Sequence, residues 1–168
     1  HQLKKTPEQH FADIKANVEL ALKNNIKTNV YLEDWSNGMR NSKDYVFKYL
    51  DFLTTQNIER VLLPDTLGIL TPEETFLFLN EVREKYSNIH IDFHGHNDYD
   101  LGVANVMKAV KAGVNGLHLT INGMGERAGN APMASAIAVI KDFLNDEAEV
   151  NVNETALNKV SKLVETFS

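Results

Sequence analysis

The sequence has no cysteine, no long apolar run and no cluster of basic residues among its 168 positions. Without cysteine there is no disulfide, no thiolate nucleophile and no cysteine-built zinc site. No stretch approaches the roughly 18 apolar residues that a membrane-spanning helix needs. The 17 Lys and Arg residues face 23 Asp and Glu residues, for a formal net charge of −6, and this balance gives no electrostatic footprint for a phosphate backbone. We therefore expect neither a membrane nor a nucleic acid as a partner.

The remaining composition is typical of one soluble globular domain, or most of one. Hydrophobic residues make up 43% of the chain, which suffices for a sizeable core at this length. There is no signal peptide at the start, so we expect a reducing, cytoplasmic setting. The chain begins with His1 rather than Met, and we interpret residues 1–168 as a piece of a longer protein.

Helical and strand patterns alternate along the chain. Helices begin at good capping sequences, such as Thr6 followed by Pro7. The expected helices are 6–25, 44–56, 71–86, 101–112, 131–144 and 153–167. The expected strands are 28–34, 60–65, 89–94 and 116–121. Connections of this length favour parallel strands covered by helices, and therefore an α/β fold.

Polar residues follow the strands, whereas the loops that enter the strands are chemically bland. A site at the carboxyl ends of several strands is the layout of a TIM (β/α)8 barrel. An open doubly wound sheet is the alternative, but the glycine-rich fingerprint that often marks its ligand loop is not found. Because a complete barrel needs roughly 200 to 250 residues or more, we expect this chain to cover about strands 4 to 8, the second half.

The segment 94–98 (HGHND) is the most informative motif. Side chains two residues apart on a strand point to the same face, so His94 and His96 can converge on one metal ion. Two histidines that are merely hydrogen-bonded near a strand end are the alternative. Asp92 shares the parity of His94, and either orients a ligand or is a satisfied core carboxylate.

A glycine-rich loop, 122–130 (NGMGERAGN), follows the next strand. Its three glycines allow close backbone approach to a ligand, and a helix N-terminus follows. In this loop Glu126 is a candidate acid or base and Asn130 a candidate oxygen ligand. Thr66, after another strand, is a candidate carboxylate binder, although a simple turn fits equally well. Glu33 and Asp34 form a further acidic pair, for which a capping loop is the alternative.

Together these motifs resemble a known enzyme family. The segments 64–68 (PDTLG), 94–98 (HGHND), 101–105 (LGVAN) and 122–131 (NGMGERAGNA) occur in the order found in 2-isopropylmalate, homocitrate and citramalate synthases. The resemblance spans nearly the whole chain and is far more specific than any one motif. It implies a TIM-barrel acyltransferase that condenses acetyl-CoA with a 2-oxo acid in a Claisen reaction and releases CoA.

The resemblance also implies roles for individual residues. His94, His96 and Asn130 would bind a divalent metal ion, for which Mg, Mn, Zn and Co all remain open. Thr66 and Asn122 would contact the substrate. Glu33 and Glu126 would be the catalytic carboxylates, and sequence alone ranks neither of them, nor His118, as the base. The family's remaining metal ligand, an Asp, and the Arg beside it are absent, so we expect the chain alone not to turn over.

Several functions stay open at this point. The 3-hydroxy-3-methylglutaryl-CoA lyases carry a cysteine in the corresponding glycine-rich loop, and this chain has none, which favours a synthase over a lyase or aldolase. A non-catalytic half barrel is a third alternative. Overall resemblance favours 2-oxoisovalerate as substrate and therefore leucine biosynthesis, with homocitrate and citramalate synthase as alternatives. The loop that begins at Glu33 departs from the family pattern. Relatives are commonly homodimers, and we expect the same of the full-length protein.

Overall fold

The computed structural model describes residues 4–167, so His1 lies outside the described part. The strands are β1 (Asn29–Tyr31), β2 (Arg60–Asp65), β3 (Ile91–Gly95) and β4 (Gly116–His118). The helices are α1 (Pro7–Lys23), α2 (Trp35–Asn41), α3 (Lys43–Thr54), α4 (Pro72–Lys85), α5 (Gly102–Lys111), the 3-10 turn η1 (Ile121–Gly123), α6 (Met133–Phe143) and α7 (Glu154–Glu165). No helix in the described part is long and apolar enough to cross a membrane.

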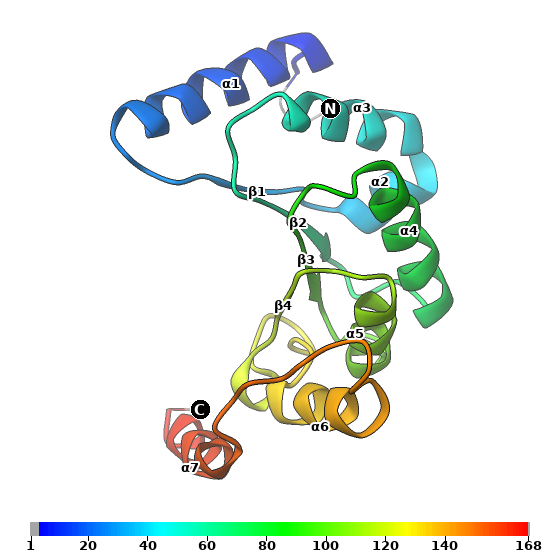
Figure 1. The fold of residues 1–168 in the computed structure, drawn as a ribbon, viewed down its shortest axis with the longest axis vertical. Coiled ribbons are helices and arrows are strands. Elements are labelled where there is room, and N and C mark those ends of the chain that lie inside the picture. The colour runs from blue at the N-terminus through cyan, green and yellow to red at the C-terminus, as the bar shows by residue number, and fades with distance from the viewer. Residues whose placement is uncertain (1–3, 168) are drawn as a thin grey trace.

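The four strands form one parallel sheet in the order β1-β2-β3-β4. Each connection returns through at least one helix, which confirms the predicted α/β class (Figure 1). The described residues hold four strands, and the position of these strands within a barrel stays a prediction. The carboxyl ends of all four strands lie at the same edge, because parallel strands share one direction.

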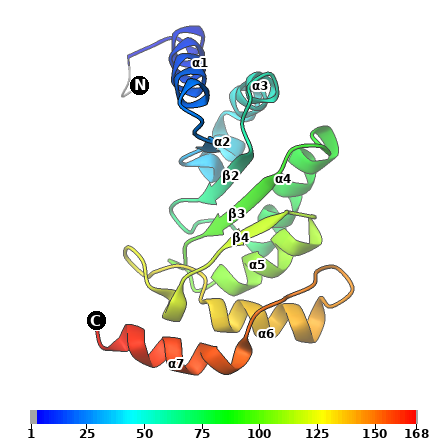
Figure 2. The ribbon, with the colours of Figure 1, turned by 60° about the vertical axis from the view of Figure 1, so that its left-hand side comes forward.

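The two faces of the sheet have different neighbours. Val61, Leu63, Ile91 and Phe93 are at most 2% exposed and belong to the main core cluster, which the sheet shares with helices such as α4 and α5, both on the same side (Figures 1 and 2). The alternate positions carry the other face. There Leu62 of β2 pairs with Asp92 of β3. Two residues further along, Pro64 pairs with His94, which in turn pairs with His118 of β4. This second face is where the polar residues gather.

The capping sequences begin their helices as expected. The Thr6 hydroxyl accepts a hydrogen bond from the backbone N–H of Gln9, and the Gln9 side-chain oxygen accepts one from the backbone N–H of Thr6. Pro7 occupies the first helical position. Thr71 and Glu74 form the same reciprocal pair at the start of α4. Each pair satisfies two backbone donors that a helix otherwise leaves open.

Several segments differ from the prediction. Residues 35–41 form α2, where only a loop was expected. This short helix buries Trp35 and Met39, which are one turn apart, to 1% and 2% exposure. The residues between and after them are polar or glycine, so the helical spacing of the two apolar residues is not evident from the sequence. The last strand ends at His118 rather than at residue 121, because the chain turns into η1 at Ile121. Helix α6 begins at Met133, with Pro132 as its cap, two residues later than expected.

Candidate functional site

The candidate site lies at the carboxyl ends of β2, β3 and β4. His94 is the next-to-last residue of β3, and its ring is half-buried beside β4. His94 Nδ1 lies 3.3 Å from the backbone carbonyl of His118. A carbonyl only accepts, so Nδ1 carries the proton and Nε2 keeps its lone pair. Burial lowers the pKa of His94, which favours the neutral ring that a metal ion requires.

His96 and Asn130 come together from different segments. Their backbones pair in an isolated antiparallel bridge, and Asn130 is 7% exposed. The His94 and His96 rings are 5.0 Å apart between centroids and nearly perpendicular. His96 Nδ1 and Asn130 Oδ1 are buried without a hydrogen-bond partner among the described residues. Buried polar atoms normally have a partner, so these two atoms are available to pair with a bound group.

The glycine-rich loop is fixed by bonds of its own. Asn130 Nδ2 donates to the carbonyl of Met124 at 2.9 Å, which orients the amide, and its oxygen lacks a partner. Gly129 has φ +85°, and a Cβ there would lie 2.0 Å from the carbonyl oxygen of Gly123. Only glycine permits that conformation and approach. The loop therefore presents the Asn130 oxygen in one orientation.

Arg127 ties the same loop to the neighbouring strand end. Its guanidinium donates to both carboxylate oxygens of Asp98, at 2.7 and 2.9 Å, and to the carbonyl of Thr66 at 2.9 Å. The Arg127 hydrogen bonds hold the pKa of Asp98 below its usual range, with burial opposing them. A paired guanidinium and carboxylate of this kind fix position as well as charge.

Thr66 and Glu33 lie in direct contact. The Thr66 hydroxyl donates to Glu33 Oε2 at 3.1 Å and accepts from the backbone of Asp34 at 2.9 Å. Glu33 itself is exposed. The structure thus brings two of the sequence-derived candidates together at the ends of β1 and β2.

Two other candidates are directed elsewhere. Asn122 bonds Ser161 on α7, with its amide nitrogen 3.0 Å from the Ser161 carbonyl and its oxygen 2.6 Å from the hydroxyl. The Glu126 side chain is 82% exposed and lies 3.5 Å from Arg127. Among the hydrogen bonds and ion pairs of residues 4–167, none joins either side chain to His94 or His96. Their predicted roles stay predictions.

Asp92 is 1% exposed, and it does not bond His94 as an orienting carboxylate would. Its oxygens lie 2.8 Å from His90 Nε2 and 3.1 Å from His118 Nε2. Burial raises the pKa of this carboxyl, but the bonds from His118 and His90 outweigh it and the net shift is downward. Asp92 is thus a satisfied core carboxylate, one of the two readings that the sequence allowed.

Sequence reasoning missed Tyr31. Its ring stands edge-on to His94 and His118, at centroid distances of 6.4 and 6.0 Å, and its hydroxyl lies 3.1 Å from His118 Nδ1. Burial, and then the charges of Glu33 and Asp92, raise the pKa of the phenol. The available signal was the shared parity of Tyr31 and Glu33 at the end of a strand.

The residues present fit a divalent metal ion in part. Three donor atoms are available: Nε2 of His94, Nδ1 of His96 and Oδ1 of Asn130. Within residues 4–167 no three His, Cys, Asp or Glu side chains are arranged to hold a metal. A set of two imidazoles and one amide oxygen suits Zn, Mn or Co and is open to further ligands.

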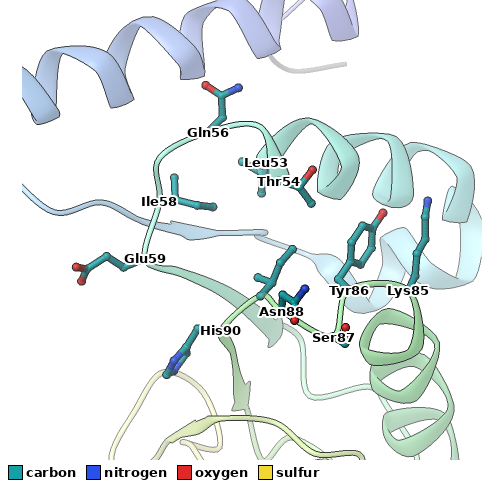
Figure 3. Close-up of a pocket in the computed structure, with 11 residues that line it drawn as sticks. Leu53, Thr54, Gln56, Ile58, Glu59, Lys85, Tyr86, Ser87, Asn88 and His90 are labelled. Carbon is teal, nitrogen blue, oxygen red and sulfur yellow. The ribbon is translucent and has the colours of Figure 1, made fainter.

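A separate pocket of about 420 Å³ lies at the opposite, amino end of the strands. Figure 3 shows its lining, with His90 at one side and Lys85 and Tyr86 at the other. In parallel α/β proteins this end contributes to stability, and ligands bind at the carboxyl end. The pocket is therefore distinct from the candidate site.

Comparisons with known proteins found a matching family model and several similar proteins. A family model described as HMGL-like matches residues 1–164. The chain is 33% identical to the 2-isopropylmalate synthase of Pyrococcus furiosus over 170 residues, covering 98% of this chain and 33% of that protein. It is 32% identical to the homocitrate synthase of Saccharolobus islandicus over 165 residues, covering 98% of this chain and 34% of that protein. The chain thus spans about a third of the length of these curated relatives.

A solved structure shows the extent of the fold. The HMG-CoA lyase of Bacillus subtilis superposes with a TM-score of 0.79 at 20% identity, over 97% of this chain and 57% of that one. At this identity the likeness speaks for the fold alone. The four βα units correspond to about half of a (β/α)8 barrel.

Proposed function

The chain belongs to the HMGL-like family, as the motifs predicted, and from that membership we propose that it carries part of the active site of a metal-dependent acyltransferase. The proposed reaction is a Claisen condensation of acetyl-CoA with a 2-oxo acid, followed by hydrolysis of the resulting thioester by water, which releases CoA. The observation that carries the proposal is the set of free donor atoms on His94, His96 and Asn130.

These three residues would hold the metal ion. The His118 carbonyl selects the tautomer of His94, and the Met124 carbonyl occupies the Asn130 nitrogen, so each presents a lone pair. We propose that a further ligand, the Asp implied by the family resemblance, comes from outside residues 4–167. When bound, the metal supplies a Lewis acid for the substrate carbonyl and its developing negative charge.

The other roles belong to residues around this donor set. We propose that Thr66 receives the substrate carboxylate, for which its hydroxyl must turn away from Glu33 Oε2, 3.1 Å away. Glu33 is then released as a proton acceptor near the reacting carbon, and we propose it as the base for the acetyl methyl group. Glu126 remains a second catalytic carboxylate, and Asn122 a substrate contact, in the proposal.

The proposed oxo acid is 2-oxoisovalerate, which would give 2-isopropylmalate in leucine biosynthesis. The relatives matched at 31 to 33% identity include 2-isopropylmalate, homocitrate and citramalate synthases, so similarity leaves the oxo acid open. One methylene changes pocket affinity by only about 1 to 3 kcal/mol. The choice among these acids therefore needs a direct measurement.

The experiment is a CoA-release assay on the full natural protein, with thiol trapping, acetyl-CoA, and Mg or Mn. 2-Oxoisovalerate, pyruvate and 2-oxoglutarate are supplied in turn. Release with one oxo acid that is abolished in His94→Ala and retained in Tyr86→Phe supports the proposal and identifies the substrate. Tyr86 serves as the control because its hydroxyl bonds Asp51 at the amino end of the strands, away from the candidate site.

A different outcome would reassign the activity. If no oxo acid releases CoA while a hydroxyacyl-CoA or a 4-hydroxy-2-oxo acid is cleaved, the protein is a lyase or an aldolase. If neither reaction occurs and metal affinity is unaffected by changing both His94 and His96, a non-catalytic half barrel is the better description.

A further inference from the structure

A line of hydrogen-bonded side chains lies on the second face of the sheet, the face that carries Asp92 and His94. Its last member lies beside His94. Asp92 Oδ1 lies 2.8 Å from His90 Nε2, and its Oδ2 lies 3.1 Å from His118 Nε2. The other ring nitrogen of His118, Nδ1, lies 3.1 Å from the hydroxyl of Tyr31. The line therefore runs from β3 across β4 to β1, and Tyr31 is its last member.

The chemistry of the groups fixes the direction of each bond. A carboxylate only accepts, so His118 Nε2 donates to Asp92. In the neutral imidazole the other nitrogen is then an acceptor, and Tyr31 donates its single proton to Nδ1. The phenolic oxygen is left with lone pairs and no donor. Tyr31 thus offers any neighbouring ligand an acceptor.

The packing keeps this arrangement in place. Asp92 is 1% exposed, and a Cβ at Gly116 would lie 2.3 Å from its Oδ1, so the carboxylate depends on the absence of a side chain there. At the other end, Tyr31 is 40% exposed and its ring contacts that of His94. One end of the line is rigid and buried, and the other end is open to a ligand at the candidate site.

We propose that Tyr31 is a ligand-binding residue that accepts a hydrogen bond from the hydroxyl group of a 2-hydroxy acid held at His94 and His96. Asp92 and His118 act as positioning residues, because they orient the phenol and do not touch the ligand. The inference rests on the proposed function and deepens it, since a 2-oxo acid has no donor at that position and the condensation product has one.

The first test measures binding by the full natural protein loaded with Mn. Calorimetry compares 2-hydroxyisovalerate with 2-oxoisovalerate, which differ by the donor, in wild type and Tyr31→Phe. Phenylalanine keeps the ring beside His94 and removes only the oxygen. We expect the hydroxy acid to bind about 3- to 10-fold more weakly in the variant, the range of one hydrogen bond, and the oxo acid to change by less than about twofold.

The second test reads the hydrogen-bond direction without any ligand or metal. Long-range ¹H–¹⁵N spectra of His118 at pH 8 should show a protonated Nε2 and an unprotonated Nδ1 in wild type. In Asp92→Asn an amide N–H can donate to Nε2, so we expect the opposite tautomer and a Tyr31 hydroxyl that is free to donate. The preference between the two acids should then move toward the oxo acid. Circular dichroism confirms that this variant is folded.

The outcomes separate the two proposals. If Tyr31→Phe weakens both acids equally, or neither, or if wild-type His118 carries its proton on Nδ1, the role of Tyr31 is wrong and the proposed function stands. If neither acid binds the wild-type protein in a metal-dependent way, the proposed function fails and this inference fails with it.

Discussion

The two ends of the strands differ in how their polar groups are satisfied. At the carboxyl end the buried polar atoms that lack a partner among the described residues include His96 Nδ1, Thr120 Oγ1 and Asn130 Oδ1. At the amino end, around the pocket in Figure 3, Lys85 and Tyr86 both bond Asp51. Thr28 Oγ1, just before β1, lacks a partner there. Unpaired buried groups cost stability, and in the proposed function a bound ligand would pair those of His96 and Asn130 at the carboxyl end.

Among the variants that test this difference between the two ends, we expect the largest effect from a substitution of His96. We expect His96→Ala to lower Mn affinity by about 100-fold or more, because losing a ligand should exceed the 10- to 100-fold cost of losing an outer-shell partner. The unfolding free energy should change by less than about 1 kcal/mol, since the Nδ1 atom makes no bond in the described structure. Calorimetric titration with Mn and urea unfolding measure the two quantities. A loss of stability without a loss of affinity would contradict the assignment.

The second prediction concerns the carboxylate between the two ends. In Gly116→Ala the added Cβ would lie 2.3 Å from Asp92 Oδ1, so the carboxylate must shift away from His90 or His118. We expect a loss of about 1 to 3 kcal/mol in unfolding free energy, the usual cost of overpacking. Urea unfolding checks this value. Gly113→Ala tests a glycine with open space around a Cβ but a positive φ, and therefore measures backbone strain without this clash.

A smaller effect is expected at the amino end. The Tyr86 hydroxyl donates to Asp51 Oδ1 at 2.7 Å, and Tyr86→Phe removes this bond without changing the packed ring. We expect a loss of about 1 kcal/mol in unfolding free energy and an unchanged Mn affinity. His96→Ala should lower Mn affinity with little change in stability, and Tyr86→Phe should lower stability with no change in Mn affinity, so the two variants test the two ends separately. A fall in Mn affinity in Tyr86→Phe would show that the two ends are coupled.

The fold was largely predictable from the sequence because its signals are periodic. Capping sequences at Thr6 and Thr71 begin helices, and short β-rich runs mark the strands. The spacing of Trp35 and Met39 was the exception, since polar neighbours concealed a short helix that tertiary burial stabilises. Propensity is a weak guide where burial decides the structure.

The candidate site was predictable only as far as local motifs extend. The pair His94 and His96 is two residues apart, and its ring proximity follows from strand geometry. The line from Asp92 through His118 to Tyr31 joins residues 26 and 87 positions apart. Such contacts depend on strand order and register, which a single sequence does not specify. For the same reason the bond between Asn122 and Ser161 on the last helix was not foreseen.

The smallest effect is a pH dependence in the loop that carries Asn130. Arg127 bonds Asp98 and holds its pKa below the usual value, which is about 3.9 in an unfolded chain. A depressed carboxyl pKa stabilises the fold above the unfolded value, and this contribution is lost as the pH falls through the folded value. Amide exchange at Gly129, whose N–H bonds the Glu126 carbonyl, should therefore accelerate slightly below about pH 4, beyond the intrinsic change with pH. In Arg127→Met the carboxyl loses the partner that depresses its pKa, so this extra step should disappear. If the step persists in that variant, the loop is held by bonds other than the one between Arg127 and Asp98.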